Sequence, residues 1–454
     1  MNSYDIVIIG AGTSSTIAAQ FSALNGLKVC LIDANKKEKI GNKTCGDVVL
    51  ATIFDFLKLN PPQGKEILSL KKIIKFYTSD LQQHLTIKMP IYLVDRLQFG
   101  QKLLRDALDS GVVEFLDNTK VVDLTYKDGS INGVIARLKT GEKVTINAKI
   151  VIDGSGVHSI VRKKIKSNII QNEISQNDVV ICYREIIQIE DNMLPTMPTD
   201  SLTVAFDPDN IPGGYFWYFP KSDTMINLGA GVLLRQKKDL KLIYRDYISN
   251  KFLSGRKYKI LSSRGDIVPI RRPLPSCADN GIMFIGDAGC HVNTANGGGI
   301  HTGMKAGYYA AMIAKKAIEA EDYSLSKLWE YNYLLMNDFG IGHATNDVAR
   351  ILLQHTNTRD FDYIIKKKLI DDTELTQMYY GKIISPSIKQ MISKFFKGMS
   401  KPKLLLKLGY LLKQMKKVNN LYLKYPQDIN GYNTWQELEN DLFSKVYLKI
   451  ICDD

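Results

Sequence analysis

The feature that most constrains this chain is a glycine-rich turn between a buried strand and a helix near its beginning. Residues 5–10 (DIVIIG) form an apolar, β-branched run, as expected for a strand buried on both faces. Residues 14–24 are rich in Ala and Ser and predict a tightly packed helix. A second apolar run, over residues 28–32, stops at Asp33. This order of elements predicts a parallel βαβ unit at the start of the chain.

The turn itself has the composition of a dinucleotide-binding fingerprint. Gly10 permits a tight turn, and Gly12 lets the backbone come close to a pyrophosphate. The helix start at Ser14 offers unpaired N–H groups and a partial positive charge to that phosphate. Ser15 replaces the third glycine but keeps a small residue there, and Asp33 is expected to accept hydrogen bonds from the adenosine ribose. The alternative, an ordinary glycine turn, is disfavoured because strand, helix and acid are all in place.

Two later segments predict which nucleotide binds. Gly286 and Asp287 end an apolar strand, where an acid can bind a ribityl hydroxyl. Residues 293–303 (NTANGGGIHTG) then open a helix. Its start, at the run Gly298, Gly299 and Ile300, would point its dipole at the flavin N1/O2 edge, which is negative when the flavin is reduced.

These segments resemble the FAD motifs of the glutathione-reductase/p-hydroxybenzoate-hydroxylase class of flavoproteins. Residues 153–156 (DGSG), followed by Ser159 and Arg162, resemble the central motif of that class. The resemblance implies FAD as the cofactor, with Arg96 contacting the pyrophosphate and Val121 among the other cofactor contacts. The chain has no second βαβ fingerprint, so electrons are expected from an external reductant, either reduced nicotinamide or a ferredoxin-like carrier.

An aromatic strand narrows the prediction further. Residues 215–220 (YFWYFP) place Tyr215, Trp217 and Phe219 on one strand face, which suits either a flat apolar binding wall or a core. With Pro220, Gly229 and Gly231 they form a YxWxFP-x8-GxG pattern that resembles the geranylgeranyl reductase family. Residues 43–47 (KTCGD) and 268–274 (VPIRRPL) extend the resemblance, which spans essentially the whole chain and points in particular to the archaeal members acting on digeranylgeranylglycerophospholipids.

The resemblance implies an FAD-dependent reductase that saturates double bonds of geranylgeranyl chains in membrane lipid precursors. Polyprenyl-quinone and polyprenyl phosphate chains are alternative substrates. A flavin monooxygenase or halogenase on the same scaffold is a rival, although a halogenase is expected to carry WxWxIP where this chain has Tyr215 and Phe219. A flavin-bound lipid carrier without enzymatic activity is a third possibility.

Reduction of an isolated alkene requires a proton as well as a hydride, so an acid is expected beside the flavin. The resemblance suggests Cys45 and Asp47 as the catalytic candidates, with Cys45 and Gly46 also near the cofactor. A packed, unreactive Cys45 is the structural alternative. His291 and His301 flank the flavin segment and either move protons or satisfy loop backbone.

Composition limits the partners and the location. The 454 residues carry a net charge of +13, which fits nucleic acid, an anionic membrane surface or an acidic substrate. The six scattered cysteines include no CxxC pair, so neither a disulfide framework nor a metal site is predicted. No apolar run reaches the roughly 18 residues that a transmembrane helix needs. We therefore expect a cytoplasmic protein whose membrane contact is peripheral.

The basic C-terminal segment is the expected membrane-facing part. Residues 382–424 contain eleven lysines and no acid. Leu404, Leu408, Leu411 and Met415 recur at helical spacing, and we predict that this stripe is mainly core. The lysines would help to orient the protein at an anionic membrane surface. Nucleic-acid binding is not expected, because no recognised binding motif accompanies the charge.

The predicted fold is α/β, with a Rossmann-like FAD-binding domain, an antiparallel sheet domain for the substrate and a helical C-terminal region. The FAD domain is expected to be discontinuous, over residues 1–50, 91–165 and 276–320. The substrate domain would comprise residues 51–90 and 166–275. Residues 321–454 would be almost wholly helical, with breaks at Pro386, Pro402 and Pro426.

Overall fold

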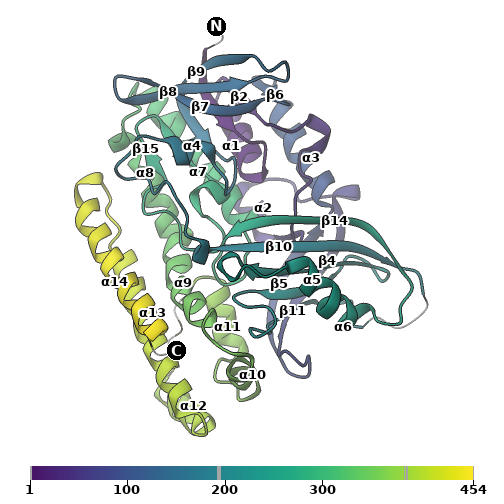
Figure 1. The fold of residues 1–454 in the computed structure, drawn as a ribbon. Helices are drawn as coiled ribbons and strands as arrows, with labels where there is room; N and C mark the ends of the chain where they lie inside the picture. Colours follow the sequence, from purple (N-terminus) through teal and green to yellow (C-terminus); the bar gives the residue numbers. More distant parts are fainter. Residues whose placement is uncertain (1–2, 192–195, 383, 385–386, 453–454) are drawn as a thin grey trace.

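The computed structural model describes residues 3–191, 196–382, 384 and 387–452, so Pro386 lies outside the described residues. Within them the chain forms two eight-stranded sheets and a helical C-terminal region, as Figure 1 shows. Pro402 begins a helix and Pro426 lies between two helices, as the sequence predicts.

The first sheet is the predicted Rossmann-like core. Its central strands run in the order β16-β9-β1-β2-β6 and pair in parallel, and β15 and the β7–β8 hairpin extend it in antiparallel fashion. The strands are β1 (Ser3–Ile9), β2 (Val29–Ile32), β6 (Val113–Leu116), β7 (Lys120–Lys127), β8 (Ser130–Arg137), β9 (Lys143–Asp153), β15 (Ala278–Asp279) and β16 (Ile282–Phe284). The helices α1 (Thr13–Leu24), α3 (Arg96–Leu108), α4 (Ile160–Lys164) and α7 (Ile300–Glu319) belong to this part of the chain.

The second sheet carries the aromatic strand. Its order is β14-β10-β13-β12-β11-β4-β5-β3, and its pairs are antiparallel except for β11 with β4, which is parallel. The predicted antiparallel sheet is therefore mixed at this one pair. The strands are β3 (Val48–Leu50), β4 (Ile67–Tyr77), β5 (His84–Val94), β10 (Val179–Ile189), β11 (Leu202–Ala205), β12 (Tyr215–Pro220), β13 (Met225–Leu233) and β14 (Tyr258–Pro269). Short helices α2 (Thr52–Leu57), α5 (Leu240–Ile243) and α6 (Asn250–Leu253) accompany it.

Two short segments belong to the second sheet although the sequence assigned them to the FAD domain. Residues 48–50 form β3, and residues 91–94 are the end of β5. They pair with each other, Val48 opposite Leu93 and Leu50 opposite Ile91. Both segments lie where the chain crosses between the sheets, and their apolar residues would suit either sheet, so the pattern alone does not place the boundary.

The rest of the chain is helical, as predicted. Its helices are α8 (Leu325–Leu335), α9 (Ile341–Leu353), α10 (Thr358–Lys366), α11 (Asp372–Tyr379), α12 (Ile388–Gly398), α13 (Pro402–Tyr422) and α14 (Tyr432–Cys452). In Figure 1, α9 to α11 cover one side of the second sheet, and α12 to α14 lie outside them. The predicted stripe on α13 is core, because Leu404, Leu411 and Met415 are buried and Leu408 packs against them.

Small residues bring α1 and α7 into backbone contact. A Cβ atom on Gly307 of α7 would lie 2.2 Å from the carbonyl oxygen of Ser14 in α1. The side chain of Ser14 also contacts Gly303 and Gly286, so the start of α1 packs against α7 and the turn that precedes it. This close crossing determines where the two helix N-termini lie.

We predict opposite stability changes for Gly307→Ala and Gly409→Ala, two glycines inside helices. Gly307→Ala should lower the free energy of unfolding by about 1–3 kcal/mol, since the clash is with backbone. A Cβ on the exposed Gly409 meets nothing within 4 Å. That variant should therefore gain up to about 1 kcal/mol from helix propensity. Thermal unfolding of both holoproteins measures the difference, and equal Tm values would contradict the proposed crossing contact.

Candidate flavin site and apolar cavity

The glycine turn after β1 has the backbone shape that a dinucleotide requires. Gly10 has φ +83°, and a Cβ there would lie 2.8 Å from the carbonyl oxygen of Gly154. Gly12 precedes α1 without a side-chain hydrogen bond to the helix start. Ser15 is fully buried, and a Cβ on Gly154 would lie 2.1 Å from its hydroxyl oxygen. The contact confirms that a small residue is needed at the position of the missing third glycine.

Asp33 lies at the end of β2, beside the same turn. Its Oδ2 accepts a hydrogen bond from the Ala11 N–H at 2.7 Å, and its Oδ1 accepts one from the Asn35 N–H at 2.7 Å. The Thr119 N–H donates to the Asp33 carbonyl at 2.9 Å, so the start of β7 adjoins this corner. Val121, two residues further on, is buried in β7. Their contacts with the adenosine half of the cofactor remain predictions.

Arg96 supplies buried donors at the start of α1. Its Nη2 donates to Thr13 Oγ1 at 2.5 Å, while its Nε and Nη1 are buried and have no hydrogen-bond partner in the described part of the chain. The Lys43 amine lies 3.9 Å from the position of a Cβ on Gly12. Unpaired buried N–H groups are costly, and a guanidinium pairs well with phosphate oxygens. These orphaned donors fit the FAD pyrophosphate.

A second set of residues forms the expected flavin end. Gly286 has φ +60° and is followed by Asp287. Gly299 directly precedes Ile300, the first residue of α7, and a Cβ on Gly299 would lie 3.6 Å from Asp287 Oδ1. Burial raises the pKa of the Asp287 carboxyl, and the nearby Lys43 and Arg96 oppose that rise. The carboxylate and the helix start therefore face one region, as the sequence predicts.

The flavin loop is tied to the aromatic strand. The Tyr215 hydroxyl donates to the Asn296 carbonyl at 2.5 Å, and a Cβ on Gly297 would lie 3.2 Å from that hydroxyl. Within the same loop the Gly298 N–H donates to Asn296 Oδ1 at 2.7 Å. The contact brings β12 of the second sheet against the loop that precedes α7.

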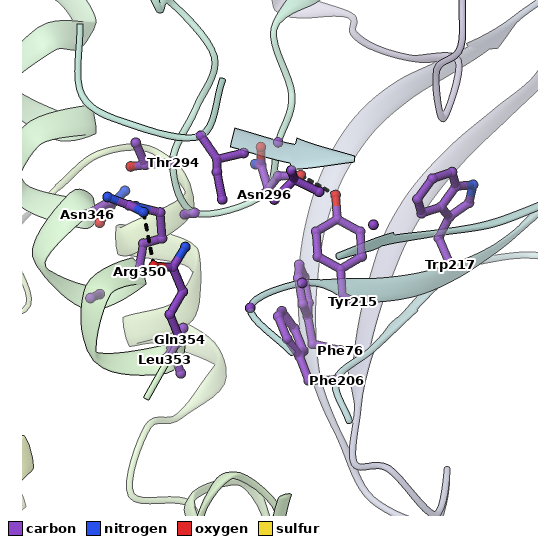
Figure 2. Close-up of a pocket in the computed structure, with 18 of the residues that line it drawn as sticks. Phe76, Phe206, Tyr215, Trp217, Thr294, Asn296, Asn346, Arg350, Leu353 and Gln354 are labelled. Atoms are coloured by element: carbon purple, nitrogen blue, oxygen red, sulfur yellow. Dashed lines mark hydrogen bonds between the residues drawn. The ribbon is translucent and has the colours of Figure 1, made fainter. Parts of the chain in front are cut away.

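An apolar cavity of about 270 Å³ lies between the second sheet and the helices α9 to α11. Five aromatic side chains form a continuous wall, with ring centroids 6.4 Å apart for Phe76–Phe206, 5.6 Å for Phe206–Tyr215, 6.1 Å for Tyr215–Trp217 and 6.3 Å for Trp217–Phe219. Figure 2 shows Tyr215 pointing at Asn296, with Arg350 and Gln354 across the cavity. Thr44, Cys45 and Gly46 line the cavity too.

Two predicted substrate residues do not line this cavity. Pro220 ends β12 on the strand face opposite Phe219. Gly229 leaves space for the Trp217 ring of the wall, because a Cβ at Gly229 would lie 2.3 Å from that ring. Gly231 does line the cavity, together with Tyr215, Trp217 and Phe219.

The helical region supplies the opposite wall, which sequence reasoning missed. The residues concerned are Asn346, Ala349, Arg350, Leu353, Gln354, Phe361, Ile364, Ile365, Ile370, Leu375, Met378 and Tyr379. Their amphipathic spacing predicts helices but does not say what the apolar faces cover.

The loop that carries Cys45 is held by buried polar contacts. The Asn227 side-chain amide donates to the Cys45 carbonyl at 2.9 Å and to Asp47 Oδ2 at 3.0 Å. The Trp217 indole N–H donates to Asn227 Oδ1 at 2.9 Å. Asn227, which sequence reasoning missed, thereby connects the cavity wall to the Cys45 loop; a lone buried amide in a strand gives no sequence signal of this role.

Cys45 and Asp47 have different surroundings. Cys45 lines the cavity, its Sγ accepts a hydrogen bond from the Asp47 N–H at 3.2 Å, and burial together with the Asp47 charge raises its thiol pKa. Asp47 has φ +63°, is 1% exposed, does not line the cavity and pairs with Lys221 at 2.6 Å. A paired carboxylate outside the cavity is poorly placed to protonate substrate, so Asp47 fits a positioning role better than the catalytic role suggested by sequence.

The two histidines also lie outside the cavity lining. His291 is fully buried, with Nε2 3.4 Å from Cys277 Sγ, and burial lowers its pKa to about 3. Burial likewise lowers the pKa of His301 to about 4. Both rings are therefore neutral near pH 7, and the His291 ring contacts Cys277 rather than the cavity.

The fold and the site define an FAD-dependent oxidoreductase. A model described as "FAD dependent oxidoreductase" matches residues 5–163, and one described as "Geranylgeranyl reductase catalytic domain" matches residues 178–268. Over 447 residues the chain is 33% identical to a digeranylgeranylglycerophospholipid reductase of Sulfolobus acidocaldarius, covering 97% of both chains. The protein belongs to the geranylgeranyl reductase family, and its cofactor is FAD.

Other proteins are similar to the chain in sequence or in fold. A digeranylgeranylglycerophospholipid reductase of Methanosphaera stadtmanae is 27% identical over 418 residues, which cover 90% of this chain and 99% of that protein. A solved geranylgeranyl bacteriochlorophyll reductase-like protein of Thermoplasma acidophilum matches with a TM-score of 0.76 at 22% identity, covering 90% of this chain and 100% of the other. A myxobacterial chondrochloren halogenase matches with a TM-score of 0.62 at 18% identity, covering 94% and 98%. These structural matches establish the fold alone.

We predict that Arg96→Ala weakens FAD binding roughly ten- to a hundredfold, because charge-assisted hydrogen bonds to the pyrophosphate are lost. Fluorescence titration of the apoprotein with FAD measures the change. Arg105→Ala on the same helix is the matched control, since Arg105 is 57% exposed and its side chain pairs with Glu66 at 3.4 Å. Equal affinities of the two variants would contradict the assignment of Arg96.

Proposed function

We propose that this enzyme saturates carbon–carbon double bonds of geranylgeranyl chains in archaeal-type membrane lipid precursors. The observation that carries the proposal is the aromatic cavity, which meets the Cys45 loop and the flavin loop. An isoprenoid chain offers only methyl groups and double bonds, so an apolar wall is the surface that can bind it. This chain resembles two digeranylgeranylglycerophospholipid reductases over most of its length, and their names support the same substrate class.

The chemistry needs a hydride and a proton for each double bond. Reduced FAD supplies the hydride when it is bound. The residues of the chain hold the alkene against the aromatic wall, exclude water and deliver the proton. Cys45 is the proposed donor, because it lines the cavity and its raised thiol pKa keeps it protonated at neutral pH. Protonation at one alkene carbon leaves a tertiary, cation-like centre that the neighbouring aromatic faces can stabilise.

Asn227 and Asp47 are proposed as positioning residues. They hold the Cys45 carbonyl and the Trp217 indole in one network, so the donor and the wall keep a constant relation. The reductant is external, either a docked reduced nicotinamide or a ferredoxin-like carrier.

Anaerobic single-turnover reduction tests the function. The holoprotein is reduced under nitrogen and mixed with geranylgeranylated glycerophospholipid, and flavin absorbance and lipid mass are followed together. We expect the flavin to reoxidise while the lipid gains two hydrogens per double bond. Reoxidation by air alone, with an oxygenated or halogenated product, would instead support the monooxygenase or halogenase rival.

Two further substrates resolve the lipid class. Polyprenyl-quinone and polyprenyl phosphate replace the glycerophospholipid in the same assay at equal concentration. Faster reduction of either one would identify that lipid class as the substrate. The proposed reduction of carbon–carbon double bonds would still hold.

We predict that Cys45→Ala retains bound flavin but lowers alkene reduction by about a hundredfold or more, the usual contribution of a positioned acid. Cys30→Ala, a buried thiol in β2 outside the cavity, is the control and should keep its turnover. Unchanged turnover of Cys45→Ala would refute the donor role.

The pH profile tests the same residue independently. Because burial raises the pKa of the Cys45 thiol, its acid form persists as pH rises past about 8.5, where a free thiol ionises. Single-turnover rates of the wild type should therefore fall only above that pH. A decline centred on the ordinary thiol pKa would contradict a buried donor.

A further inference from the structure

The helix α12 has its hydrophobic face turned outward. Four large apolar residues of α12, and Met399 directly after it, lie on a single helix face and are exposed: Met391 at 49%, Ile392 at 53%, Phe395 at 57%, Phe396 at 66% and Met399 at 54%. A helix of a globular protein normally buries such a face against the core. We call this set the α12 apolar face.

The opposite, polar face of α12 holds the helix to the protein. Lys394 pairs with the buried carboxylate of Glu374 on α11. The Tyr363 hydroxyl of α10 donates to the Lys397 carbonyl at 2.9 Å, and Gly398 packs against Leu405 of α13. Contacts on the polar side and at the helix end thus fix α12 with its apolar face towards the outside, so rotation about the helix axis to bury that face would break them.

Positive charge surrounds the α12 apolar face. Lys389, Lys397 and Lys403 are exposed beside it, and the segment 382–424 contains no acid. Large apolar and aromatic residues flanked by lysines are the composition of helices that lie in the surface of anionic bilayers. No helix in the described ranges is long and apolar enough to span a bilayer, so insertion would be limited to one face.

The same end of the molecule carries one wall of the cavity. Figure 1 shows α10 and α12 side by side at the lower tip, and α10 and α11 line the cavity through residues such as Ile364 and Met378. A neighbouring cavity of about 90 Å³ shares those two residues and reaches Leu404 and Leu408 of α13. Apolar lining therefore extends from the aromatic wall towards the helices next to α12.

We infer that α12 inserts its apolar face into the surface of an anionic membrane, so that the α10–α11 wall of the cavity lies against the bilayer that holds the lipid substrate. The membrane contact stands on α12 alone, whereas the delivery of substrate rests on the proposed function. Charge complementarity and the outward aromatic residues favour a bilayer over a second copy of this chain.

Vesicle binding tests the inference with the FAD-loaded protein. Vesicles of phosphatidylcholine with about a third phosphatidylglycerol are compared with pure phosphatidylcholine by co-sedimentation. These acyl lipids contain no isoprenoid chain, so the result does not depend on whether the enzyme reduces prenyl lipids. We expect binding to the anionic vesicles only, and a loss of at least tenfold for Phe395→Ser/Phe396→Ser. Equal binding of that variant would overturn the inference.

Matched variants separate the two contributions. Leu24→Ser/Leu70→Ser removes apolar residues that are 68% and 61% exposed elsewhere, and should bind like wild type. Lys389→Gln/Lys397→Gln/Lys403→Gln should lose binding, whereas Lys120→Gln/Lys139→Gln/Lys143→Gln, from the exposed β7–β9 surface, should not. Equal losses in both lysine variants would mean unspecific attraction by net charge and would overturn the assignment to α12.

A tryptophan probe distinguishes insertion from surface contact. The native residues Trp217, Trp329 and Trp435 are at most 6% exposed, so a Phe396→Trp variant adds an exposed reporter. Its emission should shift to the blue on anionic vesicles and be quenched by acyl chains brominated near the interface. Absence of quenching would refute insertion. If Phe395→Ser/Phe396→Ser changed the sedimentation coefficient of the protein without loss of vesicle binding, the α12 apolar face would be a protein interface, which would also refute insertion.

Discussion

The contact between the first turn of α1 and the N-terminal half of α7 determines the geometry of the cofactor site. Each helix would point its N-terminus, and so its partial positive charge, at the bound FAD. The start of α1 would face the pyrophosphate and the start of α7 would face the flavin ring. The distance between the two helix starts must therefore fit the length of one FAD molecule. Gly307, against the Ser14 carbonyl, sets that distance at backbone contact. A side chain of any size at this point would separate the two halves of the site.

A network of buried polar groups holds the Cys45 loop against the second sheet. Asn227 joins Trp217, Asp47 and the Cys45 carbonyl, and Asp47 is paired with Lys221. Each of these groups would be costly to bury alone. Their mutual contacts, made through Asp47 Oδ2, fix a loop in a left-handed conformation at Asp47, whereas Asp47 Oδ1 has no hydrogen-bond partner among the described residues. The cavity can therefore remain apolar while its polar supports lie behind the wall.

The cavity is built from regions that are far apart in sequence. They include the Cys45 loop, strands of the second sheet such as β12, the loop before α7 and the helices α9 to α11. The C-terminal region thus forms one wall of the site. Its outer helices α12 and α13 differ in what their apolar faces contact. The stripe of α13 is core, whereas α12 presents its apolar residues outward. The apolar residues of α12 and α13 have the same kind of helical spacing within one basic segment, so the sequence pattern alone does not distinguish the buried helix from the outward-facing one.

The sequence alone determined the βαβ unit, the class of cofactor, the family and the aromatic face of β12. These follow from local patterns, in which glycine, the strand period and motif order have direct structural meaning. Tertiary structure alone decided that Gly229 accommodates the Trp217 ring, that Pro220 is turned away, that Asp47 is paired behind the wall, and that β3 and the end of β5 join the second sheet. It also decided which amphipathic helix is buried. The physical reason is that periodicity specifies which residues share a face, whereas the partner of that face depends on packing between segments hundreds of residues apart.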